Sequence, residues 1–266
     1  MSSAGKVVVV TGGSGGIGRD ICSQFAEKGY RVYELSRSGE DTASATNIRC
    51  DIADAAAVSA AFHQILSETG RIDVLINNAG MGISGAIEFT DYVDAKKIIE
   101  VNFFGALYAI QAVVPAMRVQ KSGKIINICS VAADIPIPFQ AFYSAGKAAL
   151  CSLSQALGNE LRSFGISVAA ILPGDVKTGF TDARKKDHVG DDIYSGRINR
   201  SVSRMEKDEQ GGMDSSKAAK EIVAFVQRRK LKPKYTVGAQ YKLFSFLIKI
   251  LPTSLINRIV YWMYAK

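Results

Sequence analysis

The sequence is poor in the residues that bind metals or form disulfide bonds. It has only two histidines, His63 and His188, and four cysteines, with no Cys-x-x-Cys pair. Neither histidine has a partner at ligand spacing, so we expect no metal site and two surface histidines. We interpret the cysteines as reduced, two of them in the core, which is typical of a cytoplasmic protein.

Long apolar runs are also absent. No uninterrupted apolar stretch reaches the roughly 18 residues of a transmembrane helix, and no hydrophobic signal-peptide region follows Met1. There are no internal repeats and no low-complexity linkers. A chain of 266 residues with 47% hydrophobic residues suits a single α/β domain with a sizeable core.

Acidic residues are nearly missing from the last fifth of the chain. Residues 215–266 contain eleven Lys/Arg and one acid, Glu221, whereas residues 1–214 carry a net charge of −2. A basic patch can bind nucleic acid, but no nucleic-acid motif accompanies this one. We therefore expect no nucleic-acid partner.

The hydrophobic pattern alternates between short strands and amphipathic helices. Predicted strands cover 6–10, 31–35, 47–50, 73–76, 124–129, 167–171 and 235–237, and predicted helices cover 17–28, 54–69, 92–119, 142–164 and 215–229. Such alternation predicts an α/β fold with a single doubly wound parallel sheet and helices on both faces. We assign residues 1–238 to this domain. The segment 179–214 is charged, irregular and weakly periodic, which is typical of a solvated surface insertion.

A glycine-rich turn joins the first predicted strand to the first helix. The run Thr11-Gly12-Gly13-Ser14-Gly15-Gly16-Ile17-Gly18 follows four valines. Gly12 permits a tight turn, Gly16 lets backbone approach a pyrophosphate, and Gly18 lets helix pack on strand. The helix N-terminus offers free N–H groups to phosphates. The segment therefore predicts a dinucleotide site.

Tyr143 and Lys147 lie four residues apart, on one face of a predicted helix. A nearby ammonium lowers the pKa of a tyrosine toward a range useful for proton transfer. Ser130 follows the apolar run 124–129, so it lies at the carboxyl end of a strand, where ligands bind in open α/β sheets. The three side chains are candidates for one catalytic site.

Together these segments resemble the short-chain dehydrogenase/reductase family. The motifs that carry the resemblance are Thr11-Gly12-x-x-x-Gly16-x-Gly18, Asn77-Asn78-Ala79-Gly80, Asn102, Ser130, Tyr143-x-x-x-Lys147 and Pro173-Gly174. They occur in the family's order, and the resemblance covers roughly residues 5–238. It implies a Rossmann fold, a nicotinamide cofactor and a homodimer or homotetramer. It also implies that segment 179–214 covers the substrate, as the alternative to a solvated insertion.

The resemblance also implies roles for the catalytic residues. Tyr143 would be the general acid or base, and Lys147 would lower its pKa and bind the nicotinamide ribose. Ser130 would hold the substrate oxygen. Asn102 would interrupt a helix and anchor a water leading to Lys147, although it could equally be a local cap.

The end of the second predicted strand bears on cofactor choice. Ser36 and Arg37 stand where an NAD-specific fold has an acid, and a guanidinium can bind a 2′-phosphate. We therefore predict NADP(H), unless Arg37 is only a solvent-facing turn residue. Asp51 resembles the residue that holds the adenine amine, with Ile52 beside the ring, or it begins the following helix. The predicted cofactor residues are Gly12, Ser14, Gly15, Gly16, Ile17, Gly18, Ser36, Arg37, Asp51, Ile52, Asn78, Ala79, Gly80, Tyr143, Lys147, Pro173, Gly174, Val176 and Thr178.

The segment after Ser130 is largely apolar. Walls made by Ala132, Ile137 and Phe139 would suit a hydrophobic alcohol or ketone. A steroid or bile-acid hydroxyl is our first expectation, with long-chain acyl or retinoid carbonyls as alternatives. Two alternative functions are not enzymatic: a non-catalytic dinucleotide sensor and a docking scaffold. The presence of Ser130, Tyr143 and Lys147 together argues against the sensor.

Residues 239–266 are expected to form a basic, apolar, amphipathic helical extension. From residue 240 on they contain four cations, no acid and the only tryptophan, Trp262. Pro252 predicts a break between two short helices, with Thr253 or Ser254 capping the second. Three arrangements stay open: peripheral contact with a membrane surface, packing on the cleft or a partner subunit, and disorder.

Overall fold

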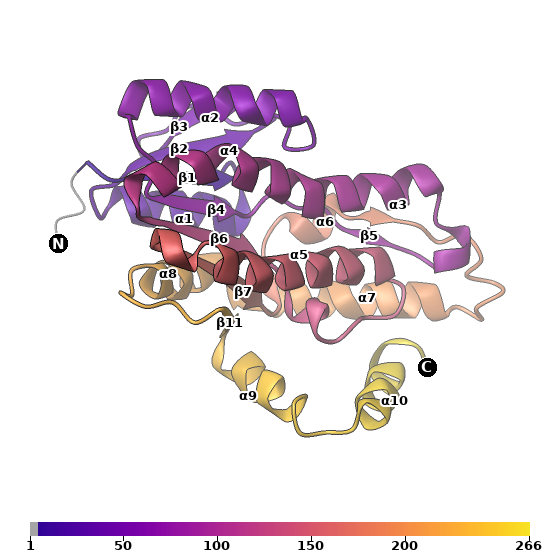
Figure 1. The fold of residues 1–266 in the computed structure, drawn as a ribbon. Coiled ribbons are helices and arrows are strands. Elements are labelled where there is room, and N and C mark those ends of the chain that lie inside the picture. The colour runs from indigo at the N-terminus through magenta and orange to yellow at the C-terminus, as the bar shows by residue number, and fades with distance from the viewer. Residues whose placement is uncertain (1–4) are drawn as a thin grey trace.

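A seven-stranded parallel sheet forms the centre of the computed structural model, which describes residues 5–266 (Figure 1). The first four residues of the predicted domain 1–238 lie outside the described residues. The sheet strands are β1 Val7–Thr11, β2 Arg31–Ser36, β3 Thr46–Arg49, β4 Val74–Asn77, β6 Gly123–Ile128, β7 Ile166–Pro173 and β11 Lys234–Val237. Their spatial order is β11-β7-β6-β4-β1-β2-β3, and every neighbouring pair is parallel. The predicted fold class is confirmed.

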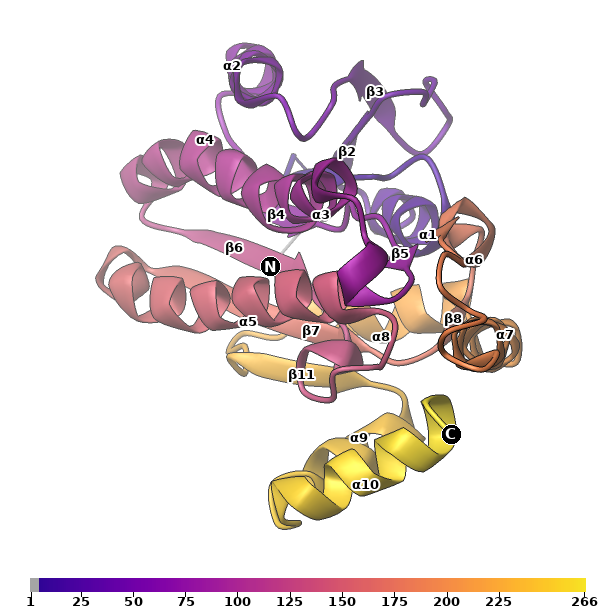
Figure 2. The ribbon, with the colours of Figure 1, turned by 90° about the vertical axis from the view of Figure 1, so that its right-hand side faces the viewer.

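The alternation of side chains along β1 creates two cores. Val7 and Val9 point into one apolar cluster, and Val8 and Val10 point into another. The first cluster is closed by α2 Ala55–Thr69 and α4 Gly105–Gln120, and the second by α1 Gly16–Ala26 and α8 Ser215–Val226. The helix α5 Ala141–Glu160 packs on β7 beside α4 (Figure 2).

Local signals in the sequence set the ends of α2. The Asp54 carboxylate caps its N-terminus by accepting hydrogen bonds from the N–H groups of Ala56 and Ala57 at 2.9 and 3.1 Å. The helix ends at Gly70, whose φ of 68° is the left-handed conformation that favours glycine.

The helix predicted over 92–119 is continuous but changes pitch. It comprises α3 Tyr92–Ile99, a π-helical turn at Glu100–Phe104 and α4. By length and composition alone, Tyr92–Gln120 could cross a membrane. Its buried stripe, which includes Ile110, Val113 and Met117, packs against the sheet and α2, as expected of a core helix.

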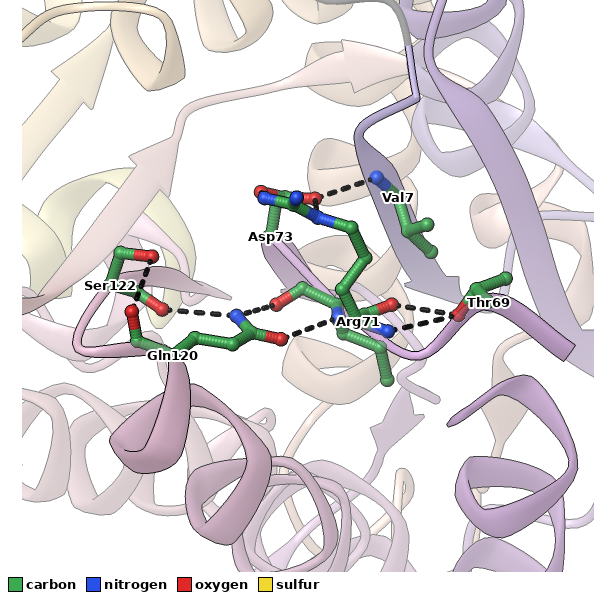
Figure 3. A network of polar contacts seen from close by, with 7 residues as sticks. Val7, Thr69, Arg71, Asp73, Gln120 and Ser122 are labelled. Atoms are coloured by element: carbon green, nitrogen blue, oxygen red, sulfur yellow. Dashed lines mark hydrogen bonds and ion pairs between the residues drawn. The ribbon is translucent and has the colours of Figure 1, made fainter. Parts of the chain in front are cut away.

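A polar network ties the amino ends of the strands together (Figure 3). The Asp73 carboxylate accepts from the Val7 N–H at 2.9 Å and from the Arg71 Nε at 3.0 Å. The Gln120 side chain exchanges two hydrogen bonds with the Ile72 backbone, at 3.0 and 2.9 Å. These bonds stabilise the end of the sheet opposite the glycine-rich turn.

The segment 179–214 is more regular than the sequence predicts. It contains α6 Phe180–Ala183, the short strand β9 Lys185–Lys186, which pairs with β5 Ile83–Ser84, and the 14-residue helix α7 Arg197–Gln210. Beyond α7, β10 Met213–Asp214 pairs with β8 Val176–Lys177. The helix α7 was missed because most of its residues are polar. Its few apolar residues form one stripe, which packs in a separate cluster with Ala86.

The extension forms two helices separated at Pro252, as predicted. They are α9 Ala239–Leu247, beside β11, and α10 Thr253–Tyr264, which contacts α7 (Figure 2). The predicted cap is wrong: Pro252 occupies the N-cap position, and neither Thr253 nor Ser254 supplies a side-chain cap bond. Proline suits this position because the first N–H groups of a helix have no partner within it.

Candidate active site

The strand order places a cleft at one edge of the sheet. The order reverses between β1 and β4, and open α/β sheets bind ligands outside the carboxyl ends of strands at such a point. A cleft of about 500 Å³ lies there. The predicted residues that line it are Gly12, Ser14, Gly15, Gly16, Ile17, Asn78, Ala79, Gly80, Ser130, Tyr143, Lys147, Pro173, Gly174, Val176 and Thr178.

The glycine-rich turn has the geometry that its sequence predicts. Gly12 has a φ of 65°, and a Cβ there would lie 2.9 Å from the Cα of Ala79. A Cβ on Gly18 would overlap the carbonyl oxygen of Gly12. Gly15 is the N-cap of α1, has no side chain to occupy the first N–H groups, and faces open space. The turn therefore fits a phosphate group held by backbone N–H groups at a helix N-terminus.

Ser130, Tyr143 and Lys147 meet on the opposite wall of the cleft. Ser130 follows β6 and caps a short 3₁₀ helix, Val131–Ala133, by accepting from the Ala132 N–H at 3.1 Å. Tyr143 is half-buried in the lining of the cleft, and the contact of its hydroxyl with Ser130 lowers its pKa. The Lys147 Nζ lies 5.8 Å from the Tyr143 ring centroid and donates to the Ile128 carbonyl at 2.8 Å.

The pKa of Tyr143 differs from the expectation drawn from its spacing to Lys147. Burial raises this pKa to about 12, the Ser130 hydrogen bond lowers it, and the Glu209 carboxylate raises it again. The Lys147 ammonium is directed to a backbone carbonyl, and burial lowers its own pKa. The predicted lowering by Lys147 is therefore not the dominant effect in this arrangement.

Asn102 lies in the π-helical turn and binds the loop after β4. Its side-chain oxygen accepts from the Met81 N–H at 2.8 Å, and its side-chain nitrogen donates to the Met81 carbonyl at 2.9 Å. A Cβ on Gly80 would lie 3.2 Å from the Asn102 oxygen and 3.4 Å from the Lys147 Nζ. Asn102, from the interrupted helix, and Lys147, from α5, thus approach the same glycine. The local-cap reading is wrong because Asn102 bonds outside its own helix.

The predicted adenosine-side residues lie outside the cleft lining but on the same sheet edge. Ser36 ends β2, and its hydroxyl donates to the Glu34 carboxylate at 3.1 Å. Arg37 is exposed and forms no ion pair with any residue in 5–266. Asp51, after β3, accepts from the Ala53 N–H at 3.0 Å. Ile52 is only 8% exposed, and a Cβ on Gly105 would touch its side chain, so it belongs mainly to the core.

Several side chains near the cleft carried no sequence signal. The cleft is also lined by Asp175, Phe180 and Glu209. The last two belong to segment 179–214, where the sequence shows no motif. The buried Arg184 pairs with Glu209, which also accepts from the Thr181 hydroxyl at 2.6 Å. The missed helix α7 therefore supplies a charged group to the site.

The predicted apolar wall is confirmed in part. Ala132 and Ile137 line the cleft. Phe139 does not; it packs against Tyr194, with 5.5 Å between ring centroids. Among residues 5–266, no group of three metal-binding side chains comes together.

Comparison with known proteins gives consistent matches. The family model for short chain dehydrogenase matches residues 6–189. The chain is 38% identical to a 3-ketodihydrosphingosine reductase of Bacteroides thetaiotaomicron over 227 residues, 84% of each protein. It is 36% identical to a 3-oxoacyl-[acyl-carrier-protein] reductase of Staphylococcus aureus over 193 residues, 67% of this chain and 77% of that one.

A solved structure agrees over nearly the whole fold. A short-chain dehydrogenase from Streptomyces avermitilis superposes with a TM-score of 0.83 at 27% identity, covering 97% of this chain and 99% of that one. With the motifs in place around one cleft, the chain belongs to the short-chain dehydrogenase/reductase family of oxidoreductases, which act on carbonyl and alcohol groups.

Proposed function

We propose that this protein is an NADP(H)-dependent enzyme that interconverts a ketone and a secondary alcohol on a long-chain lipid. The observation that carries the proposal is the single cleft that joins the glycine-rich turn to Ser130, Tyr143 and Lys147. When bound, the nicotinamide supplies or accepts the hydride. The protein has to orient the substrate and move one proton.

The chain's own residues divide this work. The Ser130 hydroxyl, at the end of β6, would donate to the substrate oxygen where negative charge develops. The Tyr143 hydroxyl would give that oxygen its proton in reduction and remove it in oxidation. Because burial raises the pKa of Tyr143 to about 12, the residue keeps its proton at neutral pH, which favours reduction. Lys147 would position the cofactor ribose beside Tyr143.

The preference for NADP(H) rests on Ser36 and Arg37. The exposed guanidinium has no carboxylate partner among residues 5–266, so it is available for a phosphate. Glu34 is the nearest acid along the strand, but it is buried and bonded to Ser36 and Asn47. Burial also raises the pKa of the Glu34 carboxyl.

The long-chain substrate is supported by two of the relatives. Their names specify a 3-keto group on dihydrosphingosine and a 3-oxo group on an acyl chain. Ala132 and Ile137 give the cleft an apolar wall of the kind such a chain requires. No relative reported above is named for a steroid, so a steroid or bile-acid hydroxyl and a retinoid carbonyl stay predictions without such support. The homo-oligomer, cytoplasmic location and division at residue 238 likewise stay predictions.

A turnover panel tests the proposal. Consumption of NADPH would be measured with 3-ketodihydrosphingosine, a long-chain 3-oxoacyl thioester and a ketosteroid, and each would be repeated with NADH. We expect turnover with at least one long-chain ketone and a preference for NADPH. Cofactor binding without turnover of any ketone would favour the dinucleotide sensor, and turnover of the ketosteroid alone would favour the steroid reading.

A further inference from the structure

The two helices of the extension leave an apolar face without a partner. On α10, Leu255, Ile259 and Trp262 share one face and are 43, 41 and 53% exposed. On α9 and the turn after it, Leu243, Phe246 and Ile250 are 59–61% exposed. We call these six residues the outer face. Monomeric proteins seldom expose so many large apolar side chains on one short segment, so this segment is a candidate interaction surface.

Contacts with the catalytic body fix the opposite sides of both helices. The Tyr241 hydroxyl donates to Asp175 at 2.5 Å, and the Thr236 and Ser245 hydroxyls lie 2.9 Å apart. On α10, Val260 is buried and the Tyr264 hydroxyl donates to Asp208 at 3.1 Å. With one side attached, the helices cannot turn the outer face inward.

The cleft does not use this face. No residue of 239–266 lines it, although Tyr241 packs on Gly174 at its rim. Of the arrangements considered from sequence, cleft lining is therefore not adopted by the outer face, and both helices are ordered elements of the described chain.

The cations of the extension indicate what kind of partner binds the outer face. Lys249 and Arg258 are exposed and form no ion pair within residues 5–266, and the Lys266 Nζ lies 3.6 Å above the Trp262 ring centroid. Residues 239–266 contain no acid. In a symmetric contact between two copies, the same patch meets itself, so these cations would face like charges. An anionic lipid surface satisfies both the cations and the apolar side chains.

We propose that the outer face docks this protein on anionic phospholipid membranes. The geometry also bears on substrate access, because α9 starts against the Gly174–Asp175 rim of the cleft. A helix is about 10 Å across, so docking would hold that rim roughly one helix from the lipid. Docking itself is independent of the proposed substrate.

Vesicle flotation of the full-length protein tests this inference. The vesicles would be phosphatidylcholine with and without phosphatidylglycerol. We expect binding only with phosphatidylglycerol, weakening with salt. Each cation near such a surface is worth about 1 kcal/mol, or roughly fivefold in affinity, so Lys249→Glu/Arg258→Glu should weaken binding by about 25-fold or more. Phe246→Ser/Trp262→Ser should also release the protein.

Matched controls separate this surface from general stickiness. Lys96→Glu/Lys97→Glu reverses two exposed cations on α3, and Val119→Ser removes a side chain that is 84% exposed on α4. Both should bind vesicles like the wild type, and all variants should bind NADPH, which verifies folding.

Three outcomes would overturn the inference: no vesicle binding, equal binding to neutral vesicles, or unchanged binding by the outer-face variants. Self-association lost in Phe246→Ser/Trp262→Ser, without vesicle binding, would assign the face to a second copy instead. Turnover of a small water-soluble ketone is measured in parallel. A failure of docking with turnover intact would leave the proposed enzyme function standing, whereas docking without turnover would leave only the membrane surface.

Discussion

Two side chains of opposite charge act on the pKa of Tyr143, in addition to its burial. Glu209 raises its pKa and the Arg184 guanidinium, paired to Glu209, lowers it, so α7 adjusts the proton donor from outside the sequence motif. A tyrosine with a pKa of about 12 stays protonated until strongly alkaline pH. We therefore expect ketone reduction to persist across neutral pH and alcohol oxidation to rise toward alkaline pH.

The first prediction removes the transferable proton. Tyr143→Phe keeps the ring and should leave NADPH binding unchanged while turnover falls by roughly 10²-fold or more, the scale of general acid–base catalysis. Tyr92→Phe, at a tyrosine that is 78% exposed, is the matched control and should be fully active. Near-normal turnover of Tyr143→Phe would show that another group supplies the proton.

The second prediction concerns the charge of Glu209. Glu209→Gln keeps one oxygen acceptor, for Arg184 or Thr181, replaces the other with an amide NH2, and removes the carboxylate charge that raises the pKa of Tyr143. The pKa should fall, so the pH profile for alcohol oxidation should move to lower pH. The measurement is the pH dependence of kcat/KM for oxidation. A profile that stays in place, or moves to higher pH, contradicts the assigned influence.

The third prediction tests cofactor choice. Arg37→Ala should weaken NADPH binding by about 1.5–3 kcal/mol, roughly 10- to 100-fold, because a charge-assisted contact to the 2′-phosphate is lost. NADH binding should hardly change. Fluorescence titration with both cofactors measures this, and Arg162→Ala removes an exposed arginine elsewhere as a control. Equal losses for both cofactors would show that Arg37 does not contact the phosphate.

Among the elements, the regular sheet strands were the most predictable from sequence. All seven were predicted within two residues at each end, because apolar runs such as Val7–Val10 pack into cores on both faces. The long helix was also predicted. Its π-helical turn was recognised only through Asn102, since pitch depends on the tertiary bond to Met81.

The elements around the substrate side were less predictable. Most residues of α7 are polar, and its short apolar stripe is recognisable only by its packing against Ala86 and Tyr264, which are far away in sequence. For the same reason Glu209 and Arg184 were missed as neighbours of Tyr143. The displacement of Phe139 from the cleft depends on its φ of 61°, which no residue pattern signals.

The fourth prediction concerns the packing of the glycine-rich turn. A Cβ on Gly18 would overlap the Gly12 carbonyl oxygen, and one on Gly15 would meet no atom within 4 Å. Gly18→Ala should therefore lower the free energy of unfolding by roughly 1–3 kcal/mol, as overpacking does, and weaken cofactor binding. Gly15→Ala is the matched control for stability. Chemical denaturation compares them, and equal stabilities would mean that the turn relaxes freely.

At the scale of the whole molecule, the C-terminal part of the chain differs from the rest in net charge but is bonded to it. Residues 1–214 carry a net charge of −2, and the net positive charge of the chain comes from the residues beyond them. Yet the extension is attached to the body at both ends: Tyr241 contacts the cleft rim and Tyr264 contacts α7. The change in net charge falls near residue 214, inside the predicted domain 1–238, and these two contacts link the extension to that domain.

The last prediction concerns the hydrogen bond between Tyr241 of the extension and Asp175 of the catalytic body. Burial raises the pKa of this carboxyl above its ordinary value of 3.8, and the Tyr241 hydrogen bond lowers it. A carboxyl with a raised folded-state pKa destabilises the fold when charged, and this effect disappears as pH falls through that pKa. Tyr241→Phe removes the bond, so it should lower the free energy of unfolding at neutral pH by about 1–3 kcal/mol, with a smaller difference from wild type in acid. Denaturation at both pH values measures this, with Tyr261→Phe, an exposed tyrosine of α10, as the control. If the extension unfolded separately from the body, Tyr241→Phe would leave the main transition unchanged at both pH values.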